Sequence, residues 1–156
     1  MTRAFVALGS NLGDRLYELR RAVRALDERV ACSTVFETDP VGGPAGQGPY
    51  LNMVVQLETD RSPRQLLDTC RALEQAAHRE RIVRWGPRTL DVDIVWIDGV
   101  TVDEPDLQVP HPRYAERPFV LAPLAELAPD IVPPGWEARF DDLRIHRLGT
   151  LDELVN

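Results

Sequence analysis

The pattern of apolar and polar positions along the chain predicts an alternation of strands and helices. Apolar residues recur at helical spacing from about Asp14 to Arg29, and again after Ser62-Pro63, a pair typical of a helix start. Short apolar runs typical of strands lie at Arg3–Leu8, Val30–Phe36, Leu51–Thr59 and Leu90–Ile97. The chain therefore begins with the order strand, helix, strand, strand, helix, strand.

This order is typical of a ferredoxin-like βαββαβ core, in which an antiparallel sheet carries its helices on one face. The apolar run Phe119–Leu127 predicts a further helix. We expect the elements after Asp98 to extend the sheet or to cover its other face. Because 156 residues is the size of one domain, the predicted fold is a single α+β domain over residues 1–156.

Alternation within two of the strands assigns their faces. In Leu51–Thr59 the apolar odd-numbered positions share one face, whereas Asn52 and Gln56 lie on the other. In Leu90–Ile97, Asp91 and Asp93 share one face, and the face expected to meet the core takes Leu90, Val92, Ile94 and Trp96. Asp98-Gly99 follows directly and predicts a hairpin turn.

Composition narrows the possible function classes. A chain of 156 residues is long enough to bury a core without a disulfide or a metal. The net charge of −7 argues against a nucleic-acid-binding protein, which usually presents a basic face. The sequence has neither an apolar stretch of membrane-spanning length nor a signal-peptide pattern. We therefore expect a cytoplasmic protein, with Cys32 and Cys70 as buried free thiols.

All 18 residues in the Lys and Arg class are arginine. A GC-rich genome is the simplest explanation of this bias. It still has a chemical consequence, because a sequence without lysine has neither a P-loop lysine nor a Schiff-base lysine.

The most informative chemistry lies at Asp91 and Asp93. On one face of a strand, the Cα atoms of these two residues are about 6.5–7 Å apart. Neighbouring carboxylates are costly to desolvate unless a cation neutralises them, and Mg²⁺ prefers one or two carboxylates together with phosphate oxygens. An Asp-x-Asp motif without further signals would more often belong to a solvated edge strand that carries two acidic residues and binds no metal.

The arginines before this pair change that balance. Four of them fall within ten residues, at Arg79, Arg81, Arg84 and Arg88. Arginine forks match phosphate oxygens, so the combination predicts a metal-bound nucleoside triphosphate, although each arginine alone would usually be an exposed loop residue. Trp85 in the same stretch is expected to cover a ligand. Spacing alone leaves open whether His111 contacts a phosphate or stabilises a turn.

Four segments resemble the 6-hydroxymethyl-7,8-dihydropterin pyrophosphokinase (HPPK) family of the folate pathway. They stand in the family's order with its approximate spacing, from the start of the chain to about residue 134. The segments are Ala7–Asp14 (ALGSNLGD), Pro49–Asn52 (PYLN), Arg84–Ile94 (RWGPRTLDVDI), and Val109–Arg113 (VPHPR) with Arg117–Leu121 (RPFVL).

The resemblance implies transfer of the β,γ-diphosphate of ATP to the hydroxymethyl group of the pterin, with release of AMP. Asp91 and Asp93 would hold two Mg²⁺ ions and would carry the catalysis together with Arg79 and Arg88. The residues around ATP would be Glu74, Arg79, Arg81, Arg88, Ile94 through its backbone, His111 and Arg117.

The resemblance also implies a pterin pocket. Its walls would be Thr38, Val41, Tyr50, Asn52 and Phe119, with Trp85 closing over it. A flat heterocycle would stack between Tyr50 and Phe119, and the amide of Asn52 complements the amide-like edge of a pterin. The implied partners are these small molecules, without nucleic acid or membrane, and we expect a monomer.

Two other functions share part of this pattern. A different metal-dependent nucleotide enzyme, such as a cyclase or a nucleotidyl transferase, would need the Asp pair but no pterin pocket. An RNA-binding sheet would need exposed aromatic residues and a basic face. The sequence also departs from the family, since Asp39 stands where Pro is common, and Asp106 and Gln108 stand where some relatives have Arg and Thr near the nucleotide.

Overall fold

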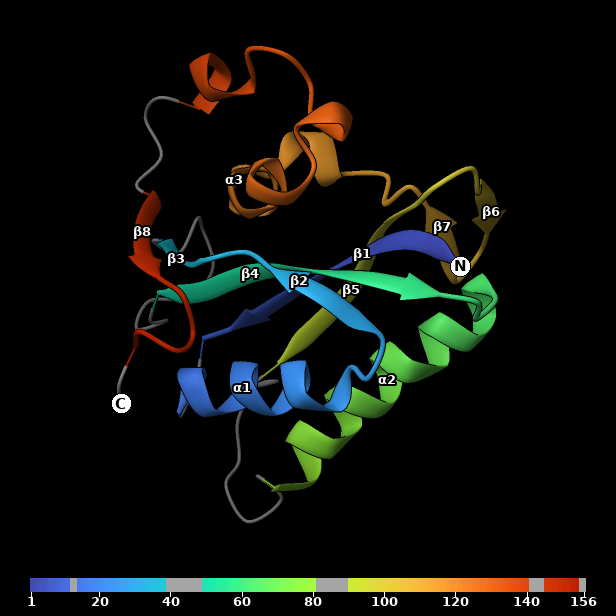
Figure 1. Ribbon diagram of the computed structural model, residues 1–156, viewed down its shortest axis with the longest axis horizontal. Helices are drawn as coiled ribbons and strands as arrows, with labels where there is room; N and C mark the ends of the chain where they lie inside the picture. The colour runs from blue at the N-terminus through green and yellow to red at the C-terminus, as the bar shows by residue number, and fades with distance from the viewer. Residues whose placement is uncertain (12–13, 39–48, 81–89, 141–144, 155–156) are drawn as a thin grey trace.

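A computed structural model describes residues 1–11, 14–38, 49–80, 90–140 and 145–154 of the chain (Figure 1). Its main sheet has six strands in the order β5-β1-β4-β3-β8, with β2 also pairing with β4. The strands are β1 (Thr2–Ser10), β2 (Arg29–Cys32), β3 (Val35–Thr38), β4 (Tyr50–Thr59), β5 (Asp91–Ile97) and β8 (Ile145–Gly149). Every pairing among these described strands is antiparallel, so the fold is α+β.

Helices cover both faces of the sheet. α1 (Arg15–Ala25) and α2 (Pro63–Glu80) lie on one face, and α3 (Pro118–Leu127) lies on the other (Figure 1). The smaller elements are the two-stranded sheet β6 (Val102–Glu104) and β7 (Leu107–Val109), and three 3₁₀ turns at Tyr114–Glu116, Pro129–Ile131 and Trp136–Phe140. The expectation for the chain after Asp98 is confirmed, because α3 covers the second face and β8 extends the sheet beyond β3.

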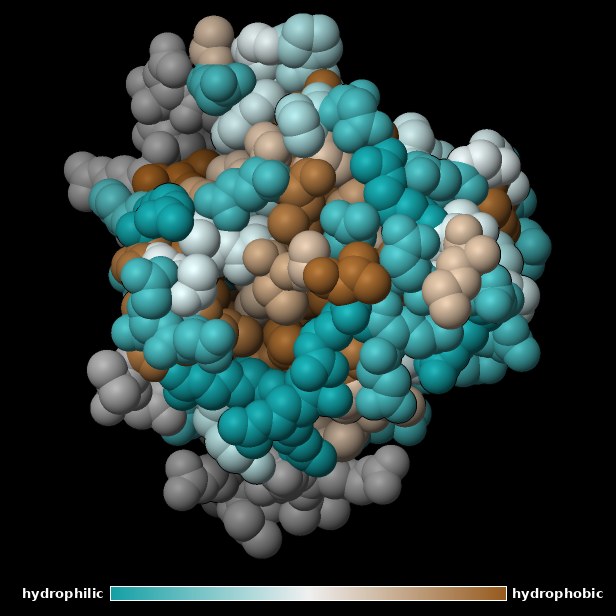
Figure 2. Space-filling view, in the orientation of Figure 1, coloured by the Kyte–Doolittle hydropathy of each residue, from teal (hydrophilic) through white to brown (hydrophobic). Residues whose placement is uncertain are grey.

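The two faces carry separate apolar cores. On the α1 and α2 side, the odd-numbered residues of β4 from Leu51 to Leu57 pack with buried residues such as Leu19 and Leu66. On the α3 side, a smaller core is formed by Phe5, Val54, Val95, Val120, Leu124 and Ala128. Hydrophobic residues also gather in the middle of the view in Figure 2, at the level of the sheet between α3 and the pair α1 and α2. The alternation predicted for β4 is thus confirmed.

The predicted helix from Asp14 to Arg29 ends earlier than expected. The side chain of Asp14 caps α1 by accepting a hydrogen bond from the backbone N–H of Tyr17 at 3.0 Å. α1 ends at Ala25, and the N–H of Leu26 still bonds back to the carbonyls of Ala22 and Val23. Arg29 already belongs to β2, where it pairs with Leu57, so cross-strand pairing overrides the helical spacing at this end.

The predicted strand Val30–Phe36 is wrong as a single element, because Ser33 and Thr34 divide it into β2 and β3. The N–H of Ser33 bonds the carbonyl of Val54, while the hydroxyl of Ser33 accepts from the N–H of Val54, both at 2.9 Å. The backbone and hydroxyl of Thr34 instead bond to Glu126 of α3, each at 2.7 Å. Side-chain bonds thus interrupt the regular backbone pairing at Ser33 and Thr34 and divide the strand.

The two cysteines differ in exposure. Cys70 is buried in the core as predicted. Cys32 is exposed, so its predicted burial is wrong. It lies on β2, where the neighbouring Val30 is also 55% exposed. This short strand has apolar letters but presents most of its side chains to solvent.

A register shift in β5 changes the side on which Trp96 lies. Leu90, Val92 and Ile94 pack in the α1 and α2 core as predicted. Trp96 packs on the α3 side, with its ring edge-on to Tyr114 at a centroid distance of 6.1 Å. The cause is a bulge at Val95, because Ile94 pairs with Val6 and Trp96 pairs with the adjacent Phe5. Trp96 therefore packs against the core on the α3 side, and the prediction that it shares a face with Leu90, Val92 and Ile94 is wrong.

The turn at Asp98-Gly99 is present, but it does not form a hairpin. Gly99 has a φ of +70°, and the N–H of Val100 bonds the carbonyl of Ile97 at 3.1 Å. The chain then leaves the main sheet, since β6 pairs with β7. Among the described helices, none has the length and apolar character required to cross a membrane.

Candidate active site

The floor of the candidate site is formed by two small residues of the central strand β1. Gly9 pairs with Asp91 of β5 on one side and with Asn52 of β4 on the other. Ala7 likewise pairs with Asp93 of β5 and with Val54 of β4. A Cβ atom built on Gly9 would lie 3.1 Å from Oδ1 of Asn52. The small residues therefore leave space between the acidic pair and the Asn52 amide.

The space above this floor is a hollow of about 440 Å³, which we call the first hollow. This volume lies within the range of small-molecule sites. Its walls contain the uncharged residues Thr38, Tyr50, Asn52, Phe119 and Val120, and the charged residues Asp91, Asp93, Arg113, Glu116 and Arg117. The first hollow thus combines an apolar, aromatic part with an acidic pair.

Hydrogen bonding fixes the amide in this hollow. Both Asn52 and Thr38 are buried, and Nδ2 of Asn52 donates to the hydroxyl of Thr38 at 2.9 Å. Tyr50 lies directly opposite Thr38 in the β3–β4 pairing. Burial, with a smaller effect from the Asp91 carboxylate, raises the pKa of the Tyr50 hydroxyl, which therefore stays protonated at neutral pH.

The opposite wall belongs to the start of α3. Pro118 occupies the first turn of this helix, where proline's fixed φ favours helix initiation, and Phe119 follows it. The guanidinium of Arg117 lies over the Phe119 ring, 5.9 Å from its centroid. Tyr50 and Phe119 therefore contribute aromatic rings to one hollow from two different elements.

A second hollow, of about 310 Å³, lies on the other side of Asp93. Besides Asp93, it is lined by Leu67, Val92, Ile94, Pro105, Asp106, Leu107, Gln108, His111 and Pro112. Asp93 lines both hollows. A ligand in the second hollow can consequently meet a ligand in the first at the acidic pair.

His111 is held beside this junction by the bulge in β5. Its backbone N–H donates to the carbonyl of Val95 at 2.9 Å, and its Nδ1 accepts from the N–H of Arg113 at 3.1 Å. Burial, together with Arg117, lowers the pKa of His111, while Asp93 acts in the opposite direction. The neutral ring that results carries its proton on Nε2, which makes this atom a hydrogen-bond donor.

The acidic pair fits a divalent cation that is only partly held by protein. In the described part of the chain, no group of three or more His, Cys, Asp or Glu side chains could enclose a metal ion. Asp91 and Asp93 are half-buried and share the first hollow. Two carboxylates, with coordination positions left for phosphate oxygens, are the donor set that suits Mg²⁺.

The remaining predicted residues fall into three groups. Glu74 of α2 accepts a hydrogen bond from the N–H of Val92 at 2.9 Å, which ties α2 to β5, and it lines neither hollow. Arg117 lies in the first hollow rather than in the second. The backbone of Arg79 forms part of the last turn of α2. Its side chain lies outside the described residues, as do Val41, Arg81, Trp85 and Arg88.

Six residues that line the first hollow were missed as functional positions, namely Ala7, Leu8, Gly9, Arg113, Glu116 and Val120. Arg113 stands in a segment that resembles the family, so the motif itself was a signal for it. Glu116 had no sequence signal. Ala7 also stands in a segment that resembles the family, but only the folded chain shows that it pairs with Asp93.

Comparison with known proteins identifies the family. Residues 5–129 match the family described as 7,8-dihydro-6-hydroxymethylpterin-pyrophosphokinase (HPPK). The chain is similar to three proteins named 2-amino-4-hydroxy-6-hydroxymethyldihydropteridine pyrophosphokinase. The protein from Bacillus subtilis is 43% identical over 88% of this chain and 85% of its own length. The protein from Methylorubrum extorquens is 41% identical, over 89% of this chain and 90% of its own. The protein from Pseudomonas aeruginosa is 43% identical, over 85% and 84%. The chain belongs to the HPPK family.

Proposed function

We propose that the chain performs its family's reaction at Asp91 and Asp93, with the pterin in the first hollow and ATP approaching from the second. As a member of the family it is a pyrophosphokinase, a transferase of folate biosynthesis with ATP as co-substrate. The observation that carries the proposal is that Asp93 lines both hollows. The acceptor hydroxymethyl group and the transferred β-phosphorus would meet beside it.

In the first hollow, the pterin ring stacks between Tyr50 and Phe119. The carbonyl oxygen of Asn52 accepts from the amide-like edge of the ring, since Nδ2 of the same side chain is engaged by Thr38. This arrangement directs the hydroxymethyl group across Gly9 and Ala7 toward the acidic pair. Val41 and Trp85 remain predicted parts of the same pocket.

In the second hollow, ATP contacts the backbone of Ile94 and the Nε2 donor of His111. Asp106 would repel phosphates there, but Arg64 binds both of its carboxylate oxygens at 2.8 Å. Its charge is therefore partly neutralised. Arg79, Arg81 and Arg88 remain predicted phosphate ligands, with Arg79 and Arg88 supporting the transfer step, and Arg117 would reach the phosphates from the first hollow.

Asp91 and Asp93 would hold two Mg²⁺ ions, which when bound supply positive charge at the transferring diphosphate. The chain's own residues orient the two substrates and exclude water between them. Transfer through a metaphosphate-like transition state depends mainly on such positioning and charge stabilisation. We assign no protein nucleophile.

The wider arrangement proposed is one ferredoxin-like domain over residues 1–156 that acts as a cytoplasmic monomer. The strand order β5-β1-β4-β3, with α1 and α2 together on one face, supports the ferredoxin-like assignment.

The test of the reaction is incubation with ATP, Mg²⁺ and 6-hydroxymethyl-7,8-dihydropterin. We expect equal amounts of AMP and diphosphorylated pterin. Formation of ADP, or of a product that retains AMP, would contradict diphosphate transfer, and the latter would select a nucleotidyl transferase instead.

The test of the pocket is Asn52→Ala, with Gln56→Ala as a matched amide control on the same face of β4. Asn52→Ala should raise the Kd of the pterin at least about tenfold, because the removed amide leaves polar groups of the ligand unpaired. The Kd of a non-hydrolysable ATP analogue should change little. Equal loss of both ligands would place Asn52 in the scaffold rather than in the pocket.

A further inference from the structure

Arg15, the first residue of α1, joins the two strand ends at one side of the first hollow. Its Nη1 donates to Oε2 of Glu37 at 3.0 Å and to the carbonyl oxygen of Pro49 at 2.8 Å. Glu37 directly precedes Thr38, and Pro49 directly precedes Tyr50. We propose that Arg15 is a positioning residue for pterin binding, which sets the spacing of Thr38 and Tyr50 without touching the ligand.

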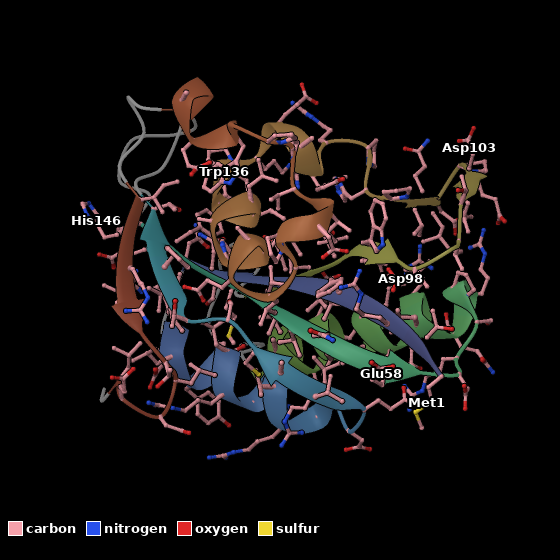
Figure 3. The ribbon with its side chains drawn as sticks, turned by 45° about the horizontal axis from the view of Figure 1, so that its top comes forward. Met1, Glu58, Asp98, Asp103, Trp136 and His146 are labelled. Carbon is pink, nitrogen blue, oxygen red and sulfur yellow. The ribbon has the colours of Figure 1, made fainter. Side chains whose placement is uncertain are left out.

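The position of Arg15 behind the sheet separates this role from direct contact. Glu37 follows Val35 by two residues, so both point to the face on which Val35 packs with α1 and α2. Thr38 points to the opposite face and into the first hollow. Glu37 also lies opposite His146 of β8, whose exposed ring projects outward (Figure 3). The Glu37 carboxylate bonds to Arg15.

The strand ends need such support because their pairing is short. β3 and β4 share only the described pairs Phe36 with Asn52, Glu37 with Leu51, and Thr38 with Tyr50. Among the described residues, Thr38 and Tyr50 form the last pair, and Tyr50 has no other strand partner, whereas Thr38 also pairs with Ile145 of β8. A strand end with few backbone bonds opens most readily. A single guanidinium nitrogen that bonds both strands beside this pair opposes that opening.

The charge and the partial burial of the contact make it effective. Arg15 and Glu37 have side-chain exposures of 29% and 30%, so water screens the pair less than a fully exposed one. The bond to Glu37 is between ionised groups, which strengthens it. The Asp14 cap fixes the start of α1 and therefore the place from which Arg15 reaches.

This inference rests on the proposed pterin pocket, and the test separates the two. We would measure the Kd of 6-hydroxymethyl-7,8-dihydropterin by calorimetry, with Mg²⁺ and a saturating non-hydrolysable ATP analogue present. The variants are Arg15→Met, Arg15→Lys and Glu37→Gln. Arg24→Met serves as a matched control on the same helix, and Asn52→Ala reports on the pocket itself.

Arg15→Met should raise the pterin Kd about tenfold, which corresponds to one lost interaction of about 1.4 kcal/mol. The Kd of the ATP analogue should stay within about twofold, and Arg24→Met should bind as the wild type does. Arg15→Lys should recover part of the affinity, because an ammonium keeps the charge and can donate to either partner. Glu37→Gln should weaken binding less than Arg15→Met, and adding it to Arg15→Met should have little further effect.

Wild-type pterin affinity in Arg15→Met, with a loss in Asn52→Ala, would overturn the role of Arg15 and leave the pocket intact. Wild-type affinity in Asn52→Ala would overturn the pocket instead. Equal weakening of both ligands by Arg15→Met, without recovery by lysine, would show a general structural role and contradict the proposal. If Arg15→Met does not fold, Glu37→Gln tests the same contact. A higher Kd for the pterin with an unchanged Kd for the ATP analogue would support the proposal, and an unchanged pterin Kd would contradict it.

Discussion

At the scale of single residues, the smallest side chains shape the site. Gly9 and Ala7 separate the acidic pair of β5 from the Asn52 amide of β4, and larger residues there would fill the floor of the first hollow. Glycine is favoured at position 9 because the side chain of Asn52 lies close to it. Its backbone conformation does not require glycine, since Gly9 has no positive φ. The shape of the first hollow thus depends on the absence of a side chain at Gly9.

We predict that Gly9→Ala weakens pterin binding while ATP affinity is retained. The added methyl group would lie 3.1 Å from Oδ1 of Asn52, so the oxygen that accepts from the pterin must shift by a few tenths of an ångström. Calorimetric titration of both ligands checks this, and thermal unfolding controls for stability. Unchanged pterin affinity would show that Asn52 is not held against the floor in the bound state.

The two thiols should differ in reactivity. Burial, with smaller effects from Asp93 and Glu74, raises the pKa of the Cys70 thiol to about 12, so almost no thiolate forms at pH 8. Cys32 is exposed. We expect one rapidly reacting thiol per native chain with a disulfide reagent and two in denaturant, and Cys32→Ser should abolish the rapid reaction. Two rapid thiols in the native protein would contradict the burial of Cys70.

At the scale of residues, the sequence predicted residues that line the first hollow but not which residues lie opposite one another in the sheet. Asp91, Asp93, Asn52 and Tyr50 could be selected from residue type and motif. The opposition of Gly9 to both Asp91 and Asn52 could not, because register depends on pairing between strands that are distant in sequence. The exposure of Cys32 was missed for a similar reason, since its short strand has apolar letters and a solvent-facing position.

At the scale of elements, α3 and β8 together hold the side of the sheet that carries Thr38. Glu126 of α3 binds the backbone and hydroxyl of Thr34, and Arg147 of β8 lies 3.4 Å from the same carboxylate. β8 pairs along β3 from Thr38 to Val35. The helix that presents Phe119 is thus tied to the strand that presents Thr38.

We predict that Glu126→Ala lowers the free energy of unfolding by about 2–3 kcal/mol, because it leaves the buried polar groups of Thr34 without their charged acceptor. Urea denaturation at neutral pH measures this. Glu137→Ala, an exposed acidic residue of the following 3₁₀ turn, is the control and should change stability by less than about 0.5 kcal/mol. A Glu126→Ala value as small as the control's would show that the tie to Thr34 contributes nothing.

The positions of helices and strands with strong local patterns were predicted correctly from the sequence. The positions of elements that depend on contacts with distant parts of the chain were not. α2, α3 and β4 followed from capping, apolar spacing and alternation. The division between β2 and β3 did not, because Ser33 and Thr34 act through partners in β4 and α3. β8 has only a weak pattern and becomes a strand by pairing with β3, more than one hundred residues earlier.

At the scale of the whole molecule, the fold brings two hollows together at one edge of β5. The first hollow collects residues from β1, β3, β4, β5 and the start of α3, whereas the second lies between β5, α2 and the segment around β7. Asp93 is the acidic residue that lines both of them. Element order and family motifs predicted which segments take part, but the shared position of Asp93 required the folded chain.

The most direct test of this account is the single-turnover rate of diphosphate transfer in Asp93→Asn, with ATP, Mg²⁺ and pterin at saturating concentrations. If Asp93 supports the metal site at the junction of both substrates, the rate should fall by about 100-fold or more. Pterin affinity and thermal stability should stay near the wild-type values. Transfer at the wild-type rate by a folded, saturated Asp93→Asn enzyme would contradict the central claim that the two hollows meet at this carboxylate for catalysis.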